Sequence, residues 1–288
     1  MPSLIDIRRR IRSVKSTQQI TKAMKMVSTA KLRRAQDRVL SSRPFSRMAA
    51  EILQKVSAAA LGDERIAEHP LLARRQEKTA QLVLITSDRG LAGAFSTNLI
   101  KAAQQLLADK TAAGVAVEFE LYGRKGRDFF ARRPVTISGE VTGISEKASL
   151  EDAERLAAKL ARRFESGEVD SVYLLFNEFK SVLSQKVTLK RILPMDLPEG
   201  GAAQDYIFEQ PPAEILGRML PAFIRIQVLE AFLESAAAEH AARMTAMESA
   251  STNAAEVISK LTLHMNRVRQ ASITNEIIEV VSGAGALE

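Results

Sequence analysis

Both ends of the chain are long stretches of helix-forming residues. Residues 4–60 contain no glycine and one proline, Pro44. The first apolar positions recur at spacings of three and four and then continue less strictly, at Leu4, Ile7, Ile11, Val14, Ile20, Met24 and Val27. Such spacing places apolar side chains on one side of a helix. We therefore predict a helix over this segment, with residues 42–44 as a candidate break.

The C-terminal stretch shows the same kind of pattern over a greater length. Pro211 and Pro212 favour a helix start, and from there to residue 282 the only glycine is Gly217 and the only further proline is Pro221. Spacings of three and four then alternate through Met244, Met247, Ser251, Ala254, Ile258, Leu261, Met265 and Val268. This alternation predicts a coiled-coil seam. Because an isolated long helix would expose its apolar stripe, we expect the two terminal helices to form an antiparallel coiled coil.

Between these segments, short apolar runs alternate with amphipathic stretches. The runs that predict strands are residues 81–86, 115–122, 135–141, 171–176 and 186–193, and those that predict helices are 96–110, 125–133 and a segment that Ser149 begins. Such alternation favours a Rossmann-like α/β domain with a mostly parallel sheet. We therefore divide the chain into an N-terminal coiled-coil helix (1–60), a central α/β domain (61–210) and a C-terminal coiled-coil helix (211–288).

Charge and composition narrow the class of protein. The net charge is +7, but residues 1–60 alone carry +11, with 14 lysines and arginines against three acidic residues, so the remainder is mildly acidic. The absence of cysteine excludes disulfides and cysteine-ligated metal centres. No run of about 18 uncharged apolar residues predicts a membrane span. A basic helical arm is therefore attached to a mildly acidic remainder.

One turn is a candidate site for binding a phosphate or a nucleotide. It covers residues 87–95 between a predicted strand and a predicted helix, where a phosphate could meet a helix N-terminus. Its glycines, Gly90 and Gly93, follow a G-x-x-G spacing that matches neither the dinucleotide nor the P-loop motif. We favour a structural turn, with Asp88 and Arg89 as a local ion pair or a partner contact. A nucleotide-dependent enzyme that uses this turn stays an alternative.

No catalytic constellation or metal-ligand spacing stands out, since the three histidines show no paired spacing and the carboxylates are scattered over amphipathic helices. We expect neither a catalytic residue nor a bound metal or cofactor.

The basic arm has two interpretations. A basic coiled-coil protein that binds nucleic acid is one alternative. Its charges surround a seam and lack aromatic neighbours, which favours an acidic protein cavity as the partner instead.

Three motifs in order then suggest a family. They are residues 5–11 with 17–27 near the start, residues 86–93 in the middle and residues 269–277 near the end. With them, the sequence resembles the gamma subunits of bacterial F-type ATP synthases from end to end. The resemblance implies a noncatalytic central rotor shaft, which couples proton-driven rotation of the ring of c subunits to ATP synthesis.

The same resemblance implies partners and a location. The coiled coil would penetrate the hexamer of alpha and beta subunits, and the α/β domain would bind the epsilon subunit and the c ring. The chain would lie at the cytoplasmic face of the bacterial inner membrane, as a peripheral protein held there by the complex. Nucleic acid would have no part in this function.

Partner-binding residues follow position by position from the resemblance. Those carried over to the moving domains of beta are Lys22 and Met24, and those carried over to the loops of the hexamer are Arg269, Gln270, Thr274 and Glu276. Tyr206 and Glu209 would lie near the c ring, and Asp88 and Arg89 complete the candidate partner contacts. Lys25 departs from the pattern because some relatives have Glu there.

Overall fold

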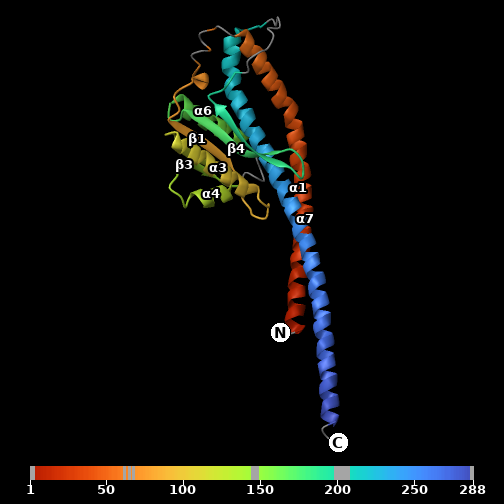
Figure 1. The fold of residues 1–288 in the computed structure, drawn as a ribbon. Helices are drawn as coiled ribbons and strands as arrows, with labels where there is room; N and C mark the ends of the chain where they lie inside the picture. The colour runs from red at the N-terminus through yellow and green to blue at the C-terminus, as the bar shows by residue number, and fades with distance from the viewer. Residues whose placement is uncertain are drawn as a thin grey trace. The chain divides into compact units, whose positions relative to one another are not determined.

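The computed structural model describes residues 4–60, 63, 66, 69–143, 149–197 and 208–285, and of residues 283–285 only the backbone. Two long helices begin and end it. Helix α1 spans Leu4–Ala59 and helix α7 spans Pro212–Gly285, each as one continuous helix (Figure 1). Both predicted terminal helices are confirmed.

Internal contacts group the chain into two units. The first unit contains Met1–Ser28 and Met244–Glu288, and the second contains Thr29–Arg243. Each terminal helix therefore contributes one part to each unit. Our division at residues 60 and 210 was drawn where the pattern of apolar positions changes, and it stays a proposal about domain organisation.

The second unit contains a five-stranded sheet in the order β3-β2-β1-β4-β5. Its strands are β1 (Thr79–Ile85), β2 (Ala116–Tyr122), β3 (Thr136–Val141), β4 (Ser171–Phe179) and β5 (Gln185–Leu193). The first four pair in parallel, and β5 pairs antiparallel to β4. The predicted α/β class with a mostly parallel sheet is confirmed. The short connection between β4 and β5 allows only a hairpin, because a parallel crossover needs a longer segment.

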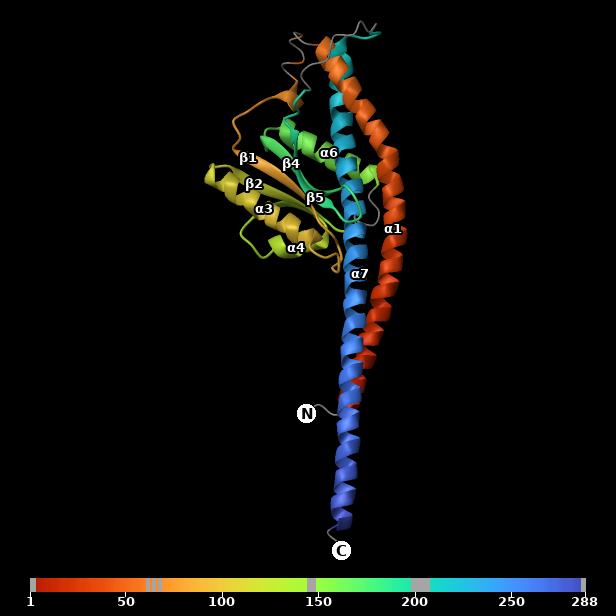
Figure 2. The ribbon, with the colours of Figure 1, turned by 45° about the vertical axis from the view of Figure 1, so that its right-hand side comes forward.

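Helices cover both faces of this sheet. Helix α3 (Phe95–Ala112) and helix α4 (Arg124–Phe130) lie on the side away from α7 (Figure 2). Helix α6 (Leu150–Glu165) and the first part of α7 cover the other side, where Val83 and Ile85 of β1 join one buried cluster with both helices. The last turns of α1 add Leu53 and Val56 to that cluster, so α1 is anchored at its C-terminal end.

Local sequence signals explain several element ends. Ser149 begins α6 as predicted, with a capping box in which its hydroxyl accepts a hydrogen bond from the Asp152 backbone N–H, and the Asp152 carboxylate accepts one from the Ser149 N–H. The predicted break near residues 42–44 is absent, because α1 continues through Pro44. A proline removes one hydrogen bond of a helix, so contacts with neighbouring elements must help to hold the helix together there.

Candidate partner-binding surfaces

The terminal segments of the first unit pair in opposite directions. The Gln18 side chain donates a hydrogen bond to the Ser251 carbonyl at 3.4 Å, and Lys25 forms an ion pair with Glu248. As the residue number rises along α1, the residue number of the contact on α7 falls. The two segments are therefore antiparallel. On α7 the predicted seam is the covered face, since Met247, Ser251 and Ala254 are buried.

The seam on α1 differs from our prediction in its second half. Ile20 and Val27 are each 56% exposed, so assigning them to the seam was wrong. Beyond Val14 the buried positions in this unit are polar, namely Thr21 and Ser28, while Gln18 and Met24 are half-buried. These residues follow Val14 at spacings of three and four. Continuing that spacing along α1, without requiring apolar residues, would have identified them. Small polar seam residues allow the two helices to approach closely.

This correction defines an outward face on α1. Ile20 and Val27 lie one heptad apart on it, whereas the exposed Lys22, two residues after Ile20, lies on the opposite flank of the helix. Met24 is half-buried at the edge of the seam. The exposed side chains around this part of α1 thus include apolar and cationic ones on different flanks, which suits contact with a protein partner. The family resemblance pointed to Lys22 and Met24 but not to Ile20 and Val27, which apolarity alone had assigned to the seam.

The far end of α7 carries a second exposed apolar surface. Five aliphatic side chains there are between 48% and 72% exposed, namely Ile273, Ile277, Ile278, Val280 and Val281. The four candidates near them are all exposed, namely Arg269, Gln270, Thr274 and Glu276. Their hydrogen bonds stay within the helix, as between the Thr274 hydroxyl and the Gln270 carbonyl at 2.9 Å. Such a concentration of exposed aliphatic side chains marks an interaction surface.

The glycine-containing turn after β1 is tied into the domain by Asp88. Its Oδ1 accepts a hydrogen bond from the Arg124 backbone N–H at 3.1 Å, and its Oδ2 accepts one from the Gly143 N–H at 2.9 Å. The Asp88 carboxylate would also repel a phosphate bound at this turn. The geometry therefore favours the structural turn over nucleotide binding. Arg89 is exposed, and its carbonyl accepts a hydrogen bond from Arg243 at 3.4 Å.

The remaining candidates, Tyr206 and Glu209, precede α7 in the sequence. Glu209 is exposed, and Tyr206 lies outside the described residues. Among the residues that the structure does describe, no helix is both long enough and apolar enough to cross a bilayer.

A polar cluster joins the starts of β1 and β4 to the end of α3. Lys110 Nζ donates to Glu77 at 2.6 Å and to the Tyr173 hydroxyl at 2.9 Å, while Ser171 and Tyr173 also donate to Glu77. Burial alone would raise the pKa of Glu77, but these hydrogen bonds outweigh it and hold that pKa below its ordinary value. The carboxylate is thus kept ionised as a structural acceptor.

Comparisons with known proteins place these features in a family. A family profile described as ATP synthase matches residues 3–287, and the chain belongs to this family. Its similar relatives include the ATP synthase gamma chain of Solibacter usitatus, at 60% identity over 288 residues and the whole of both chains. A second is the gamma chain of Anaeromyxobacter sp. strain Fw109-5, at 50% identity over the whole of both. The relation at the sequence level is therefore to gamma chains along their entire length.

Solved structures give the same fold. A chain in the rotational state 3 structure of the Euglena gracilis mitochondrial ATP synthase, described as OSCP/F1/c-ring, has a TM-score of 0.67 at 20% identity, with 99% of this chain and 94% of that one covered. A chain in the central stalk and c-ring structure of the Tetrahymena thermophila enzyme has a TM-score of 0.59 at 23% identity, covering 81% and 99%. At such identities the likeness concerns the fold.

Proposed function

We propose that this chain is the central rotor shaft of an F-type ATP synthase and contributes no catalytic residue. Membership of the family indicates that the complex is an ATP synthase. The role as the shaft is supported by the exposed aliphatic surface on α7, which is formed by Ile273, Ile277, Ile278, Val280 and Val281. A helix end of this kind needs a protein environment around it. A socket formed by the alpha and beta subunits supplies one.

Rotation would act on the catalytic subunits through differential contacts. A shaft built from two unlike helices presents a different surface in each direction, and it shifts the conformation of a beta subunit only as far as its contacts differ between states. We assign Ile20, Lys22, Met24 and Val27 to contacts with beta, and Arg269, Gln270, Thr274 and Glu276 to contacts with the hexamer loops. The exposure of the outward face on α1 supports the first assignment.

The α/β domain would bind the epsilon subunit and the c ring. We place Tyr206 and Glu209 near the c ring, and Arg89 at a partner contact. The use of both Asp88 carboxylate oxygens to bond the turn to Arg124 and Gly143 supports a noncatalytic role for this motif. The chain would be held at the cytoplasmic face of the bacterial inner membrane through these partners, without a bound cofactor.

Affinity purification from detergent-solubilised membranes of the native host tests this function. We expect the tagged chain to retain the alpha, beta, epsilon and c subunits after nuclease treatment. The double substitution Ile277→Asp with Val281→Asp should lose alpha and beta, because it places charges on the exposed aliphatic surface. Leu183→Asp is the matched control, since Leu183 is 84% exposed on the β4–β5 connection. Recovery of nucleic acid without these subunits would refute the proposal and support the alternative.

A further inference from the structure

Helix α1 has a weak point in the second unit. Pro44 has no N–H, so one helical hydrogen bond is missing beside it. The nearest fully buried apolar residues of α1 are Val39 and Leu53, and the covered positions between them include the small residues Ser42 and Ser46. A cavity of about 380 Å³ opens here between α1, α7 and the β4–β5 hairpin. Apolar packing therefore contributes little to holding α1 in place at Pro44.

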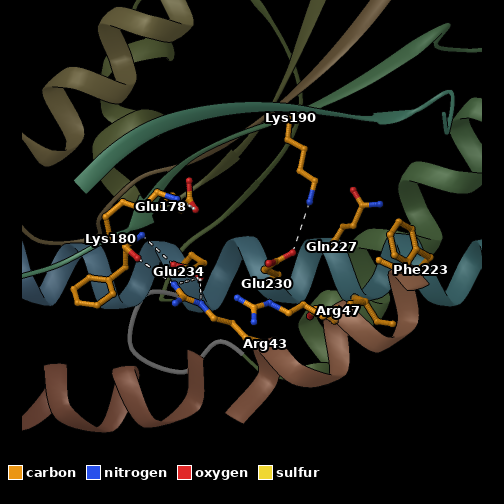
Figure 3. Close-up of a pocket in the computed structure, with 13 residues that line it drawn as sticks. Arg43, Arg47, Glu178, Lys180, Lys190, Phe223, Gln227, Glu230 and Glu234 are labelled. Carbon is orange, nitrogen blue, oxygen red and sulfur yellow. Dashed lines mark hydrogen bonds and ion pairs between the residues drawn. The ribbon is translucent and has the colours of Figure 1, made fainter. Parts of the chain in front are cut away.

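Polar contacts hold α1 in place near Pro44 instead. Arg43 Nε and Nη2 both donate to Glu234 Oε1, at 3.2 and 2.9 Å, and Nη2 also donates to the Phe179 carbonyl at 3.2 Å. The Phe179 N–H donates to the other carboxylate oxygen of Glu234 at 3.0 Å. We call Arg43, Phe179 and Glu234 the Arg43 cluster, and Figure 3 labels Arg43 and Glu234. It connects α1, α7 and the end of β4 at one place.

The burial of Glu234 makes this connection strong. Its side chain is 5% exposed, whereas that of Arg43 is 33% exposed. Removing Arg43 would leave a buried carboxylate with a single hydrogen bond from Phe179, which costs far more than losing a surface ion pair. Hydrogen bonds to a charged group are also directional, so the cluster fixes the orientation of α1 as well as its distance.

The other carboxylates around the cavity are paired as well. Lys190 of β5 lies 3.6 Å from Glu230 of α7, and Lys180 lies 2.5 Å from Glu178. Each carboxylate in the wall of the cavity therefore faces a cation. This arrangement holds elements together and leaves no uniform charge to attract a ligand.

We propose that the Arg43 cluster transmits torque between the α/β domain and helix α1 by stiffening α1 at Pro44. The inference rests on the proposed rotor function. The sheet ends in the β4–β5 hairpin, and the cluster bonds that hairpin to both terminal helices. Without it, force applied to the sheet would bend α1 at the proline before the rest of the helix turned.

Hydrogen exchange of the full chain tests the stiffening by itself. Arg43→Met should raise the exchange rates of amides in residues 38–48 about tenfold, since local opening becomes easier. Glu234→Gln should raise them less, because the charge that then loses its partner is that of Arg43, which is more exposed than that of Glu234. Pro44→Ala added to Arg43→Met should restore most of the protection, because it returns the missing N–H. Arg47→Met is the matched control on the same helix and should change nothing.

Proton pumping per ATP hydrolysed by the assembled complex tests the torque role. We expect Arg43→Met to lower this ratio on the order of threefold, as for mutations along a coupling path, while ATP hydrolysis persists. Arg47→Met should keep the wild-type ratio. Unchanged exchange in Arg43→Met would overturn the stiffening, and faster exchange with an unchanged ratio would overturn the torque role. A wild-type chain that joins no such complex would refute the proposed function instead. The hydrogen-exchange result does not depend on that function and would remain valid.

Discussion

Substitution of Gly123 by alanine should disrupt the start of α4. Gly123 lies between β2 and α4 with φ +96° and ψ 142°, a region that residues other than glycine rarely adopt. A Cβ added there would lie 2.1 Å from the Thr86 carbonyl oxygen and 2.8 Å from the Thr86 hydroxyl. Neither atom can move freely, because Thr86 N donates to the Tyr122 carbonyl at 2.7 Å and Thr86 Oγ1 accepts from Gly126 N at 2.9 Å.

The magnitude follows from two contributions. Backbone strain at this conformation costs about 1–3 kcal/mol. The overlap with Thr86 forces a backbone shift or breaks hydrogen bonds of the turn, which brings the total loss in free energy of unfolding to about 4 kcal/mol or more. Gly114→Ala is the matched control, because Gly114 also has a positive φ, +77°, but a Cβ there meets nothing within 4 Å. It should lose only about 1–2 kcal/mol.

Urea unfolding of the purified chain, followed by tyrosine fluorescence, measures the difference. The chain has no tryptophan, and two of its three tyrosines, Tyr122 and Tyr173, lie on strands of the sheet, so the signal reports mainly on the α/β part. We expect the unfolding midpoint of Gly123→Ala to fall well below that of Gly114→Ala. Equal midpoints for the two variants would refute the steric argument and leave backbone strain as the whole effect.

Two further predictions concern charged groups. Because the pKa of Glu77 is lowered on folding, its stabilisation is present above the ordinary value of 4.5 and is lost as the pH falls through the folded value. Glu77→Gln should therefore be less stable than wild type at pH 7, and urea titrations should show this gap narrowing in acid; a gap independent of pH would contradict the reasoning. Lys25→Glu should weaken the helix pair by about 0.5 kcal/mol at low salt, the value typical of an exposed ion pair. Thermal melting should show recovery when Glu248→Lys is added, and no recovery would mean that the pair contributes nothing.

Local periodicity explains most of what could be predicted. Both terminal helices, the predicted strands and the capping box of Ser149 follow from spacing and residue type over a few neighbours, and these signals act within one element. The seam at Met247, Ser251 and Ala254 could be predicted from the sequence for the same reason. The exposure of Lys22 and of Arg269 agrees with their expected place on outer surfaces, although their partners stay a proposal.

The sequence by itself thus determined the elements, the α/β class and the family motifs. Only the tertiary structure decided that Ile20 and Val27 face outward and that Asp88 uses both oxygens to accept from backbone N–H groups. It alone brought Arg43 to Glu234, 191 residues away, beside a proline through which the helix continues. Contacts over such separations depend on how whole elements pack, and the periodicity of a single segment carries no information about which distant residue will fill the space beside it.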